Sequence, residues 1–495
     1  SQTGTAESFA QEIAREGEDM GFKVRVVDLE ETEEDLHGIM LDERTRDADG
    51  RSRAVFLMST YGEGEPTDNA AAFFGVVKGK AGIRTNFPEQ EGSRKDDDGG
   101  DDDDDGFAEE KKGEGDDDDD DPEAAGGNDD DDDVDPKFFD GMDYLVFGLG
   151  NRQYEHFVAM GKLADFCLNK AGANRLAELG IGDDDDDLEA DFEKWKDEVM
   201  WPLLKARYVG DDVPAEGEKP EVKEKLPACP YVTEYLPKDA APSEPDVIKA
   251  EDMHTSTKHY FTSVDCPVSV VRELRTKEDP GSTVHLEIDI SKAGDALRYN
   301  TADNLGVLPV NDDSIVESVA KALSLDLDAQ FRLKPARDGE EHRHAALFPT
   351  PCSVRECLAR YCDLTSAPRR SELKLLAAYA RDPLDRTALL RMASKEGKAE
   401  YKSKIMGAHV GIADIVTKLC PSISMPLEHF VALCPRMLPR YYTISSSSSV
   451  HPDSVHITVS LLTAERPDGS IYKGVCSHHL AGMVNSGTVR VFNRD

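Results

Sequence analysis

The 495-residue sequence lacks several features that would assign it to a class at once. No apolar run reaches the roughly 20 residues of a membrane-spanning helix, and no signal peptide is visible. Lys and Arg form no basic stripe and the net charge is −42, which excludes nucleic acid as the expected partner. The nine cysteines include no C-x-x-C pair, so we expect reduced thiols rather than a disulfide framework or a metal site.

The opening stretch, Ser1–Glu7 (SQTGTAE), has no initiator methionine and lacks the lysine that a nucleotide-binding P-loop needs. Its hydroxyls and its glycine run into a helical pattern at Ala6–Met20. This combination suits a phosphate monoester held by backbone N–H groups at a helix N-terminus. A loose, hydroxyl-rich terminus fits the same seven residues equally well.

An acidic segment, Arg94–Asp135, accounts for about half of the negative charge. Residues 96–135 hold 20 Asp and 4 Glu against 2 Lys, a net charge of −22. Self-repulsion and the scarcity of apolar residues predict disorder here, with calcium binding or partner recruitment as alternatives. The rest of the chain is still acidic, which favours a basic protein partner.

Strand and helix patterns alternate through the first 208 residues. Candidate strands are Phe22–Leu29, Arg53–Gly62 and Tyr144–Asn151, and candidate helices follow at Phe157–Ala171 and Leu188–Tyr208. This alternation predicts an α/β domain with a parallel, doubly wound sheet. In such sheets ligands bind beyond the carboxyl ends of the strands.

Beyond Gly210–Pro245, a Pro-, Glu- and Lys-rich stretch that predicts a linker, strands recur without helices between them. They are expected at Val264–Leu274, Thr283–Ile290, Leu305–Val310, Arg440–Ser445, Val455–Leu462, Tyr472–Ser477 and Thr488–Phe492. A helical region at about Ser314–Leu433 separates the first three from the rest. The simplest topology is an antiparallel β-barrel interrupted by a helical insertion.

These patterns give five segments. We place the first domain at 1–208, with the acidic insertion at 94–135, and a linker at 209–250. The barrel then occupies 251–312 and 434–495, and the helical connecting domain occupies 313–433.

Two loops at predicted strand ends each combine glycines with one tyrosine. Ser59–Asn69 (STYGEGEPTDN) contains Tyr61, and Gly148–Phe157 (GLGNRQYEHF) contains Tyr154. Glycines let the backbone approach a flat ligand, and a tyrosine ring can stack on it. A G-x-G without the third glycine is a weak dinucleotide signal. The two loops beside an anion site suggest a planar ring with a phosphate tail, which FMN fits; ordinary strand-to-helix turns are the alternative.

The segments SQTGTAE, STYGEGEPTDNA and FGLGNRQYEHFVAMGK resemble the three flavin loops of the diflavin reductase family, in particular its cytochrome P-450-directed members. By this resemblance, Gln2–Ala6 hold the FMN phosphate and Tyr61 and Tyr154 flank the isoalloxazine. Val158 stands where the family has a polar residue. The FMN-binding residues it implies are Ser1, Gln2, Thr3, Gly4, Thr5, Ala6, Ser59, Thr60, Tyr61, Gly62, Glu63, Gly64, Leu149, Gly150, Asn151, Tyr154, His156, Phe157 and Asp184.

In the second half, Arg440–Thr443 (RYYT) resembles the R-Y-Y-S motif that binds FAD, and Gly474–Ser477 (GVCS) resembles the turn that contacts the FAD phosphates. Arg440 suits a pyrophosphate because its fork pairs with two oxygens. By the resemblance, Tyr442 stacks on the flavin and Thr443, the one residue given a catalytic role, places a hydroxyl near the reactive ring nitrogen. The implied FAD-binding residues are Arg440, Tyr441, Tyr442, Thr443, Thr458, Gly474, Val475, Cys476 and Ser477.

Two positions in this half depart from the family pattern. The tyrosine and the arginine expected at the adenine side of FAD fall at Ala464 and near Val410. For Arg440–Tyr442, a barrel strand with two core-facing or edge aromatics is the alternative interpretation.

The resemblance implies electron transfer from NADPH through FAD and FMN to cytochrome P-450 and other haem proteins, on the cytosolic face of the endoplasmic reticulum membrane. It also implies that a membrane anchor, the first strand of the sheet and an NADPH-binding domain lie outside this chain, which alone would be soluble, cytosolic and poorly active. Reductases of the sulfite reductase, nitric oxide synthase or methionine synthase reductase type are alternatives. A non-catalytic flavin electron carrier and an acidic interaction protein are others.

Overall fold

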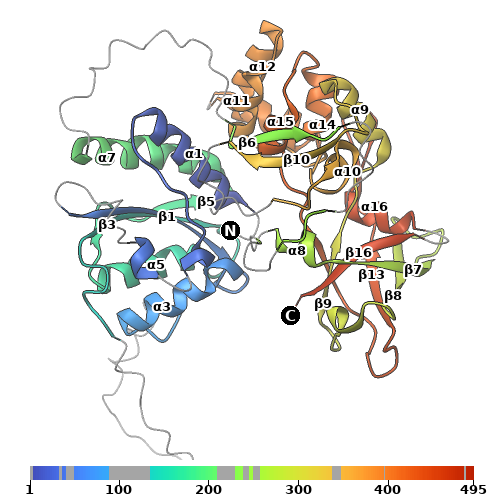
Figure 1. Ribbon diagram of the computed structural model, residues 1–495, viewed down its shortest axis with the longest axis horizontal. Helices are drawn as coiled ribbons and strands as arrows, with labels where there is room; N and C mark the ends of the chain where they lie inside the picture. The colour runs from blue at the N-terminus through green and yellow to red at the C-terminus, as the bar shows by residue number, and fades with distance from the viewer. Residues whose placement is uncertain are drawn as a thin grey trace, which may run out of the picture. The chain divides into compact units, whose positions relative to one another are not determined.

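The computed structural model describes residues 4–32, 36–40, 50–87, 134–208, 229–237, 245–248, 253, 257–336, 347–394, 396–483 and 487–494. The chain divides into two compact units, Ser1–Ala215 and Glu216–Asp495 (Figure 1). The predicted acidic insertion lies outside the described residues, apart from Val134 and Asp135, and so does most of the predicted linker. None of the described helices is both long and apolar enough to cross a bilayer.

The first unit is built on a five-stranded sheet. Strands β1 (Ser52–Tyr61) and β3 (Met142–Gly150) run parallel, and β4 (Asn174–Arg175) and β5 (Gly180–Asp183) pair with β3 in the same direction. The short β2 (Glu65–Pro66) folds back antiparallel on β1. The predicted parallel sheet is therefore confirmed, with three short strands (β2, β4 and β5) that the sequence patterns did not indicate.

Helices cover both faces of this sheet because β3 is apolar on both sides. Leu145 and Phe147 pack with α1 (Thr5–Asp19), α6 (Leu188–Trp195) and α7 (Trp201–Tyr208), whereas Tyr144 and Val146 pack with α3 (Ala71–Ala81) and α5 (Ala159–Lys170). Figure 1 shows α1 and α7 on one face and α3 and α5 on the other. In α1 the buried residues recur at helical spacing, at Ala6, Phe9, Ile13 and Gly17.

The strand predicted at Phe22–Leu29 is wrong. Residues 22–28 have no regular secondary structure, and Leu29–Thr32 form a short 3-10 helix, η1, followed by α2 (Leu36–Met40). β-branched residues favour a strand only where a neighbouring strand supplies backbone hydrogen bonds. No described strand pairs with residues 22–28, so the segment lacks the backbone hydrogen bonds that would make it a strand. The predicted helix Leu188–Tyr208 is also divided, because a π-helical segment, η6 (Lys196–Met200), separates α6 from α7.

The second unit contains a six-stranded sheet in which every pairing is antiparallel, in the order β12-β9-β16-β7-β8-β13. Its strands are β7 (Val264–Glu273), β8 (Thr283–Asp289), β9 (Asn304–Leu308), β12 (Arg440–Thr443), β13 (Ser454–Ser460) and β16 (Thr488–Arg494). One isolated antiparallel bridge joins Ile444, just after β12, to Ile457 of β13. The antiparallel sheet is confirmed, and its closure into a barrel stays a prediction.

The predicted strand Tyr472–Ser477 is partly wrong. Strand β15 (Ile471–Lys473) pairs with β14 (Thr463–Glu465), but the chain then enters helix α16 (Val475–Ala481). Cys476, Ser477 and Leu480 are buried in this helix. A spacing of three to four residues between buried positions is the period of a helix, not the alternation of a strand.

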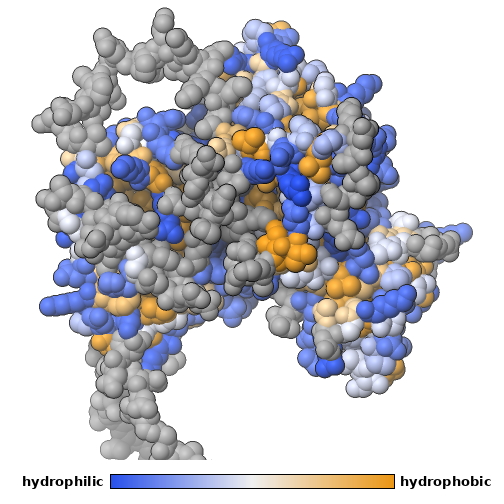
Figure 2. Space-filling view, in the orientation of Figure 1, coloured by the Kyte–Doolittle hydropathy of each residue, from blue (hydrophilic) through white to orange (hydrophobic). Residues whose placement is uncertain are grey.

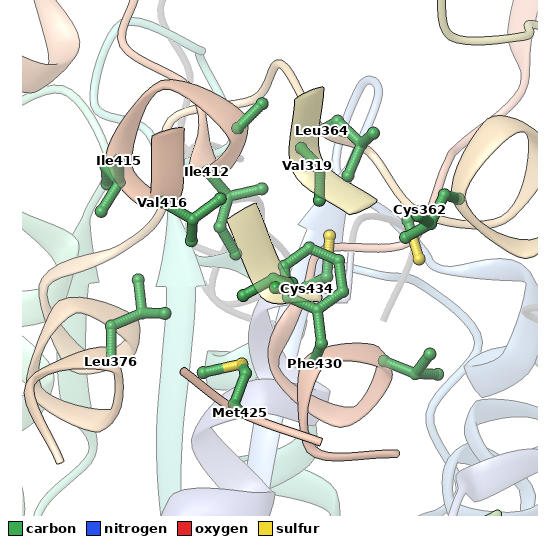
Figure 3. Close-up of a cluster of buried hydrophobic side chains, with 14 of the residues drawn as sticks. Val319, Cys362, Leu364, Leu376, Ile412, Ile415, Val416, Met425, Phe430 and Cys434 are labelled. Carbon is green, nitrogen blue, oxygen red and sulfur yellow. The ribbon is translucent and has the colours of Figure 1, made fainter. Parts of the chain in front are cut away.

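Helices fill most of the predicted connecting domain. They are α9 (Asp313–Leu323), α10 (Val354–Arg360), α11 (Arg370–Ala377), α12 (Pro383–Ala393), α13 (Lys398–Tyr401), η10 (Lys402–Met406), α14 (Ile412–Asp414), η11 (Ile415–Leu419) and α15 (Leu427–Leu433), with α8 (Lys258–Thr262) ahead of β7. Figure 3 shows Val319, Ile412, Phe430 and Cys434 directed into one buried cluster. All nine cysteines are free thiols, and all except Cys229 are buried.

The helical domain also holds a small sheet that the patterns did not predict. Strand β10 (Gln330–Pro335) pairs antiparallel with β11 (Cys352–Ser353) and with β6 (Tyr231–Tyr235), which lies inside the predicted linker. The charged and Pro-rich residues around β6 predicted a linker, so this five-residue strand was not expected. Figure 2 shows hydrophilic and hydrophobic residues interspersed over the visible face of each unit.

Candidate functional site

Three parallel strands of the first unit end side by side. In the register of the sheet Ser59 on β1 lies beside Leu149 on β3, and Gly150 lies beside Asp183 on β5. The backbone N–H of Asp184 donates to the carbonyl of Gly150 at 2.9 Å. Carboxyl ends of parallel strands form the ligand-binding edge of an open α/β sheet, and here that edge gathers residues from three of the sequence-predicted segments.

Two tyrosines stand exposed on the loops at this edge. The side chain of Tyr61 is 40% exposed and that of Tyr154 is 66% exposed. Large aromatic side chains are normally well buried in a folded domain. Two exposed rings on neighbouring strand-end loops therefore fit a site that takes a flat ligand.

The loop after β1 reverses tightly and packs on the loop after β3. Gly62 and Gly64 have φ angles of 49° and 92°, and the N–H of Gly64 donates to the carbonyl of Tyr61 at 3.2 Å. A Cβ atom on Gly64 would lie 2.8 Å from the Cβ of His156. Glycine is required at this position because both the left-handed backbone and the close approach of His156 exclude a side chain.

Two residues predicted to contact FMN also have structural partners here. The hydroxyl of Thr60 accepts a hydrogen bond from the N–H of Met160 at 3.2 Å, near the start of α5. The ring of His156 stacks on Phe87 with centroids 4.1 Å apart. These contacts fix the loops to each other, and the FMN contacts of Thr60 and His156 stay predictions.

Polar contacts hold the loop after β3 against β5. The Asn151 side-chain oxygen accepts from the N–H of Gln153 at 2.9 Å, and the Asn151 carbonyl accepts from the N–H of Tyr154 at 3.1 Å. The Arg152 guanidinium lies 3.2 Å from the Asp183 carboxylate and 5.4 Å from the centre of the Phe157 ring. The loop that carries Tyr154 is thus held by contacts within the protein itself.

Val158 places an apolar side chain at a position where the family that the sequence resembles has a polar residue. It is fully buried, with a φ of 58°, and forms the N-cap of α5. A Cβ atom on Gly148 would lie 2.2 Å from one of its methyl groups. A β-branched residue in the left-handed region is strained, and its isopropyl group faces the glycines of β3 and α5.

Of the opening loop, Ser1, Gln2 and Thr3 lie outside the described residues. Gly4 adopts a φ of 78° and is the N-cap of α1, so Thr5 and Ala6 begin the helix. Ala6 belongs to the same buried cluster as Leu149, at the end of β3. The N-terminus of a 15-residue helix carries a partial positive charge that suits a phosphate.

In the second unit, β12 carries the RYYT motif with alternating exposure. Arg440 and Tyr442 are half-buried, whereas Tyr441 and Thr443 are exposed, so the two pairs face opposite sides of the strand. The Arg440 guanidinium donates to the carbonyl of Leu438 at 2.7 Å and lies 3.8 Å from the buried Asp363 carboxylate. Its side chain stays 41% exposed, which leaves a guanidinium of set orientation beside solvent.

Tyr442 reaches the second FAD motif. Its ring packs against the buried cluster that contains Cys476, and each of the two groups affects the pKa of the other. Burial raises the pKa of both groups, that of Cys476 to about 11, so both are neutral at physiological pH. The RYYT and GVCS motifs, which lie more than thirty residues apart in the sequence, therefore meet at one place.

The other residues predicted to contact FAD have partners close by in the sequence or on the neighbouring strand. The Ser477 hydroxyl accepts from the N–H of Leu462 at 3.2 Å and donates to the Gly474 carbonyl at 3.2 Å. The Thr443 hydroxyl donates to the Asn304 side chain at 3.3 Å. Thr458 is exposed on β13. Contacts of Thr443, Thr458, Val475 and Ser477 with a flavin stay predictions.

A basic and aromatic cluster that the sequence patterns missed lies at the β14–β15 hairpin. Tyr472 sits directly opposite Ala464 in the register. Its ring stacks on His409 with centroids 4.6 Å apart, and the Arg466 guanidinium lies 5.6 Å from its centre. The turn sequence Pro467-Asp468-Gly469 is the signal that could have predicted this hairpin and its cross-strand pair.

Comparisons with known proteins agree with this arrangement. A flavodoxin family model matches residues 1–195, and an FAD-binding-domain family model matches residues 254–479. The chain is 33% identical over 505 residues to a Drosophila melanogaster protein named NADPH–cytochrome P450 reductase, a match that covers 99% of this chain and 62% of that relative. The Homo sapiens protein of the same name is 32% identical over 492 residues, covering 98% of this chain and 61% of its own.

This chain thus spans 61–62% of the length of these relatives. Each of its two units carries one of the matched domains, and the likeness to the relatives extends along nearly the whole sequence. The chain thus joins a flavodoxin domain to an FAD-binding domain, and along nearly its whole length it is similar to NADPH–cytochrome P450 reductases.

Proposed function

We propose that this chain binds FMN in its first unit and FAD in its second, and that it serves electron transfer from NADPH through FAD and FMN to cytochrome P-450 or another haem protein. The observation that carries the proposal is the presence in one chain of a flavodoxin match and an FAD-binding match. The names of the relatives support the electron donor and the acceptor. The resemblance adds a location at the cytosolic face of the endoplasmic reticulum membrane.

Two flavins suit this task for a chemical reason. A nicotinamide gives up two electrons together as hydride, a haem iron takes them singly, and a flavin can do both. The chain's own residues then have to bind each flavin, orient it and limit water around its ring. No protein metal ligand is required for any of these roles.

In the FMN site, we assign the ring to the space between Tyr61 and Tyr154 and the phosphate to the loop before α1. Stacking on two aromatic faces would cover surface that both tyrosines now expose to water. The turn around Gly64 and the hydrogen bonds of Asn151 hold the two loops in place. Asp184, fixed to Gly150 through its backbone, supports the third side of the site.

In the FAD site, we assign the pyrophosphate to Arg440 and the flavin ring to Tyr442. Asp363 and the Leu438 carbonyl hold the guanidinium, and a bidentate guanidinium–phosphate pair is among the stronger polar contacts. Thr443, on the solvent side of β12, is assigned to the reactive edge of the ring.

For the adenine end of FAD, we assign Tyr472 with His409 and Arg466. Tyr472 lies across from Ala464, the position at which the family resemblance places an aromatic residue. Directly opposed residues of antiparallel strands point to the same side of the sheet. An aromatic residue at position 472 can therefore cover the same face of the hairpin as one at position 464. Stacking on a nucleobase contributes about 1–3 kcal/mol.

The domain limits follow from the same proposal. We place the FMN domain at 1–208, the linker at 209–250 with β6 contributed from it to the helical domain, and the connecting domain at 313–433. The FAD domain then comprises 251–312 and 434–495, and its sheet closes into a barrel through the Ile444–Ile457 contact.

The acidic charge of the chain favours a haem partner with a basic face, in a contact that weakens with salt.

Flavin extraction tests the proposal. Heat-released cofactors from the purified chain are separated by chromatography and quantified against protein. We expect both FMN and FAD, in near-equal amounts. FMN alone would indicate a simple flavodoxin-type carrier, and the absence of any flavin would refute the assignment of both sites.

A further inference from the structure

Three side chains converge on the outer face of the β8–β13 strand pair. His285 and Glu287 are two residues apart on β8, and His456 lies directly opposite Glu287 on β13. The residues between them, such as Leu286 and Ile457, are fully buried on the other face. Because side chains alternate along a strand, the two imidazoles and the carboxylate share one side of the sheet.

We propose that His285, Glu287 and His456 form a binding site for a divalent transition metal, with Zn²⁺ as the preferred ion. The Nε2 atom of His285 lies 3.3 Å from one Glu287 oxygen, and the Nε2 atom of His456 lies 3.9 Å from the other. All three ligand atoms lie within 4.8 Å of one another. Two imidazoles and one carboxylate form a known zinc donor set in which water takes the fourth position.

The distances suit a tetrahedral ion after a small adjustment. Ligands bonded to zinc at about 2.0–2.1 Å in a tetrahedron lie about 3.3 Å apart. The His285–Glu287 separation already has this value. The His456 ring has to move toward Glu287, away from the Ser454 hydroxyl that now lies 2.8 Å from its Nε2 atom.

The exposure of the cluster also suits a metal. The His456 side chain is 13% exposed and that of Glu287 is 33% exposed, so a metal can enter from solvent and keep a water ligand. Arg272 lies opposite His285 on β7. Its positive charge repels a metal cation and so lowers the affinity of the site for the metal.

A bound metal would tie two neighbouring strands together. It would link β8 to β13, the last strand in the sheet order, through side chains rather than through the backbone. Thr458 follows His456 by two residues on the same face. Metal binding would therefore act on the strand that carries one of the residues assigned to FAD.

Calorimetric titration of the untagged chain with Zn²⁺ alone tests the site. Excess Mg²⁺ and Ca²⁺ are included because these hard ions occupy carboxylate clusters, whereas imidazoles favour zinc. We expect one zinc ion per chain. His285→Gln, Glu287→Gln and His456→Gln should each weaken its binding at least about tenfold, and Arg272→Gln should strengthen it.

A matched control is His37→Gln, which removes an exposed imidazole of the first unit and should leave zinc binding unchanged. Zinc affinity unchanged in all three ligand variants would overturn the proposal. Electron paramagnetic resonance of bound Cu²⁺ gives a second readout, because oxidised flavin has no signal. We expect hyperfine splitting from two imidazole nitrogens, and splitting from only one after either histidine is substituted. Splitting that stays the same in both histidine variants would contradict the site. This outcome does not depend on whether the chain holds flavin.

Discussion

Tyr472 lies directly opposite Ala464 across the β14–β15 hairpin, and its ring stacks on His409 with centroids 4.6 Å apart. Tyr472 and His409 belong to segments more than sixty residues apart in the sequence. The stack joins the helical connecting domain to the hairpin that precedes the GVCS turn. This relationship gives the adenine end of the proposed FAD site an aromatic face despite the alanine at position 464.

Removal of the Tyr472 ring should weaken FAD selectively. Loss of one stacking face, worth about 1–3 kcal/mol, predicts that Tyr472→Ala raises the dissociation constant for FAD about tenfold, while FMN binding is unchanged. Fluorescence recovery on dilution of the holoprotein measures both constants. Ile471→Ala is the matched control, since this exposed residue precedes Tyr472 on the same strand. Equal FAD affinity in the two variants would remove Tyr472 from the site.

The tyrosines of the first unit should have the opposite selectivity. Tyr61→Ala and Tyr154→Ala each remove a ring proposed to stack on FMN, so each should lower FMN affinity at least about tenfold and leave FAD bound. Flavin content after gel filtration measures the outcome. Phe166→Ala removes another exposed aromatic, on α5, and should retain FMN. FMN loss in that control as well would mean that stability, not stacking, is being measured.

The buried Asp143 predicts an acid-sensitive part of the stability of the first unit. Burial alone would raise its pKa, but hydrogen bonds from Arg51, Tyr208 and Asn174 outweigh it and hold the pKa at about 2. A depressed carboxyl pKa contributes stability above the unfolded-state pKa of about 4, and this contribution is lost as pH falls toward 2. The loss should reach about 1 kcal/mol at pH 3 and about 2 kcal/mol at pH 2.

Urea unfolding of the wild type and of Asp143→Asn at pH 5 and pH 3 isolates this contribution. The variant cannot ionise at position 143, so its stability should fall less with acid. Both tryptophans of the chain, Trp195 and Trp201, lie in this unit and report its unfolding. Equal pH dependence in the two proteins would show that Asp143 titrates normally.

Lys196 should be essential to the attachment of α1. Its ammonium group is almost fully buried and contacts the carboxylates of Glu12 and Glu16. Burial alone would lower the pKa of Lys196, but the two carboxylates raise it, so the charge is kept. Lys196→Met leaves two partly buried carboxylates without their cation, which should cost about 3 kcal/mol of unfolding free energy.

Tryptophan-detected urea unfolding measures this cost as well. Adding Glu12→Gln and Glu16→Gln to Lys196→Met removes the uncompensated charges and should restore part of the stability. A triple variant no more stable than the single one would show that packing, rather than charge, accounts for the loss.

Local patterns predicted the strands that carry the proposed sites but not every pairing between segments. β1 and β3 were predictable because β-branched and apolar runs end at glycine-rich loops, and the RYYT motif marks β12. The segment Phe22–Leu29 has the same strand composition but no partner in the described sheet, so composition alone misassigned it. Strand β6 is short and surrounded by charged residues, and it forms only because β10 pairs with it.

The sequence likewise predicted only part of the two proposed flavin sites. The motifs indicated which loops share an edge of the first sheet, because strand-end loops of a parallel sheet meet there. They did not indicate that Thr60 and Ser477 use their hydroxyls within the protein, or that Tyr472 faces His409. Such contacts depend on tertiary register, which a single sequence does not contain.

Reductive titration counts the redox-active flavins of one chain, which we propose to be two, one in each unit. Dithionite is added anaerobically to the purified chain while flavin absorbance is followed. We expect uptake of about four electrons per chain, two for each flavin, and about two after Arg440→Ala has removed FAD. Uptake of only two electrons by the wild type, or none, would contradict this proposal.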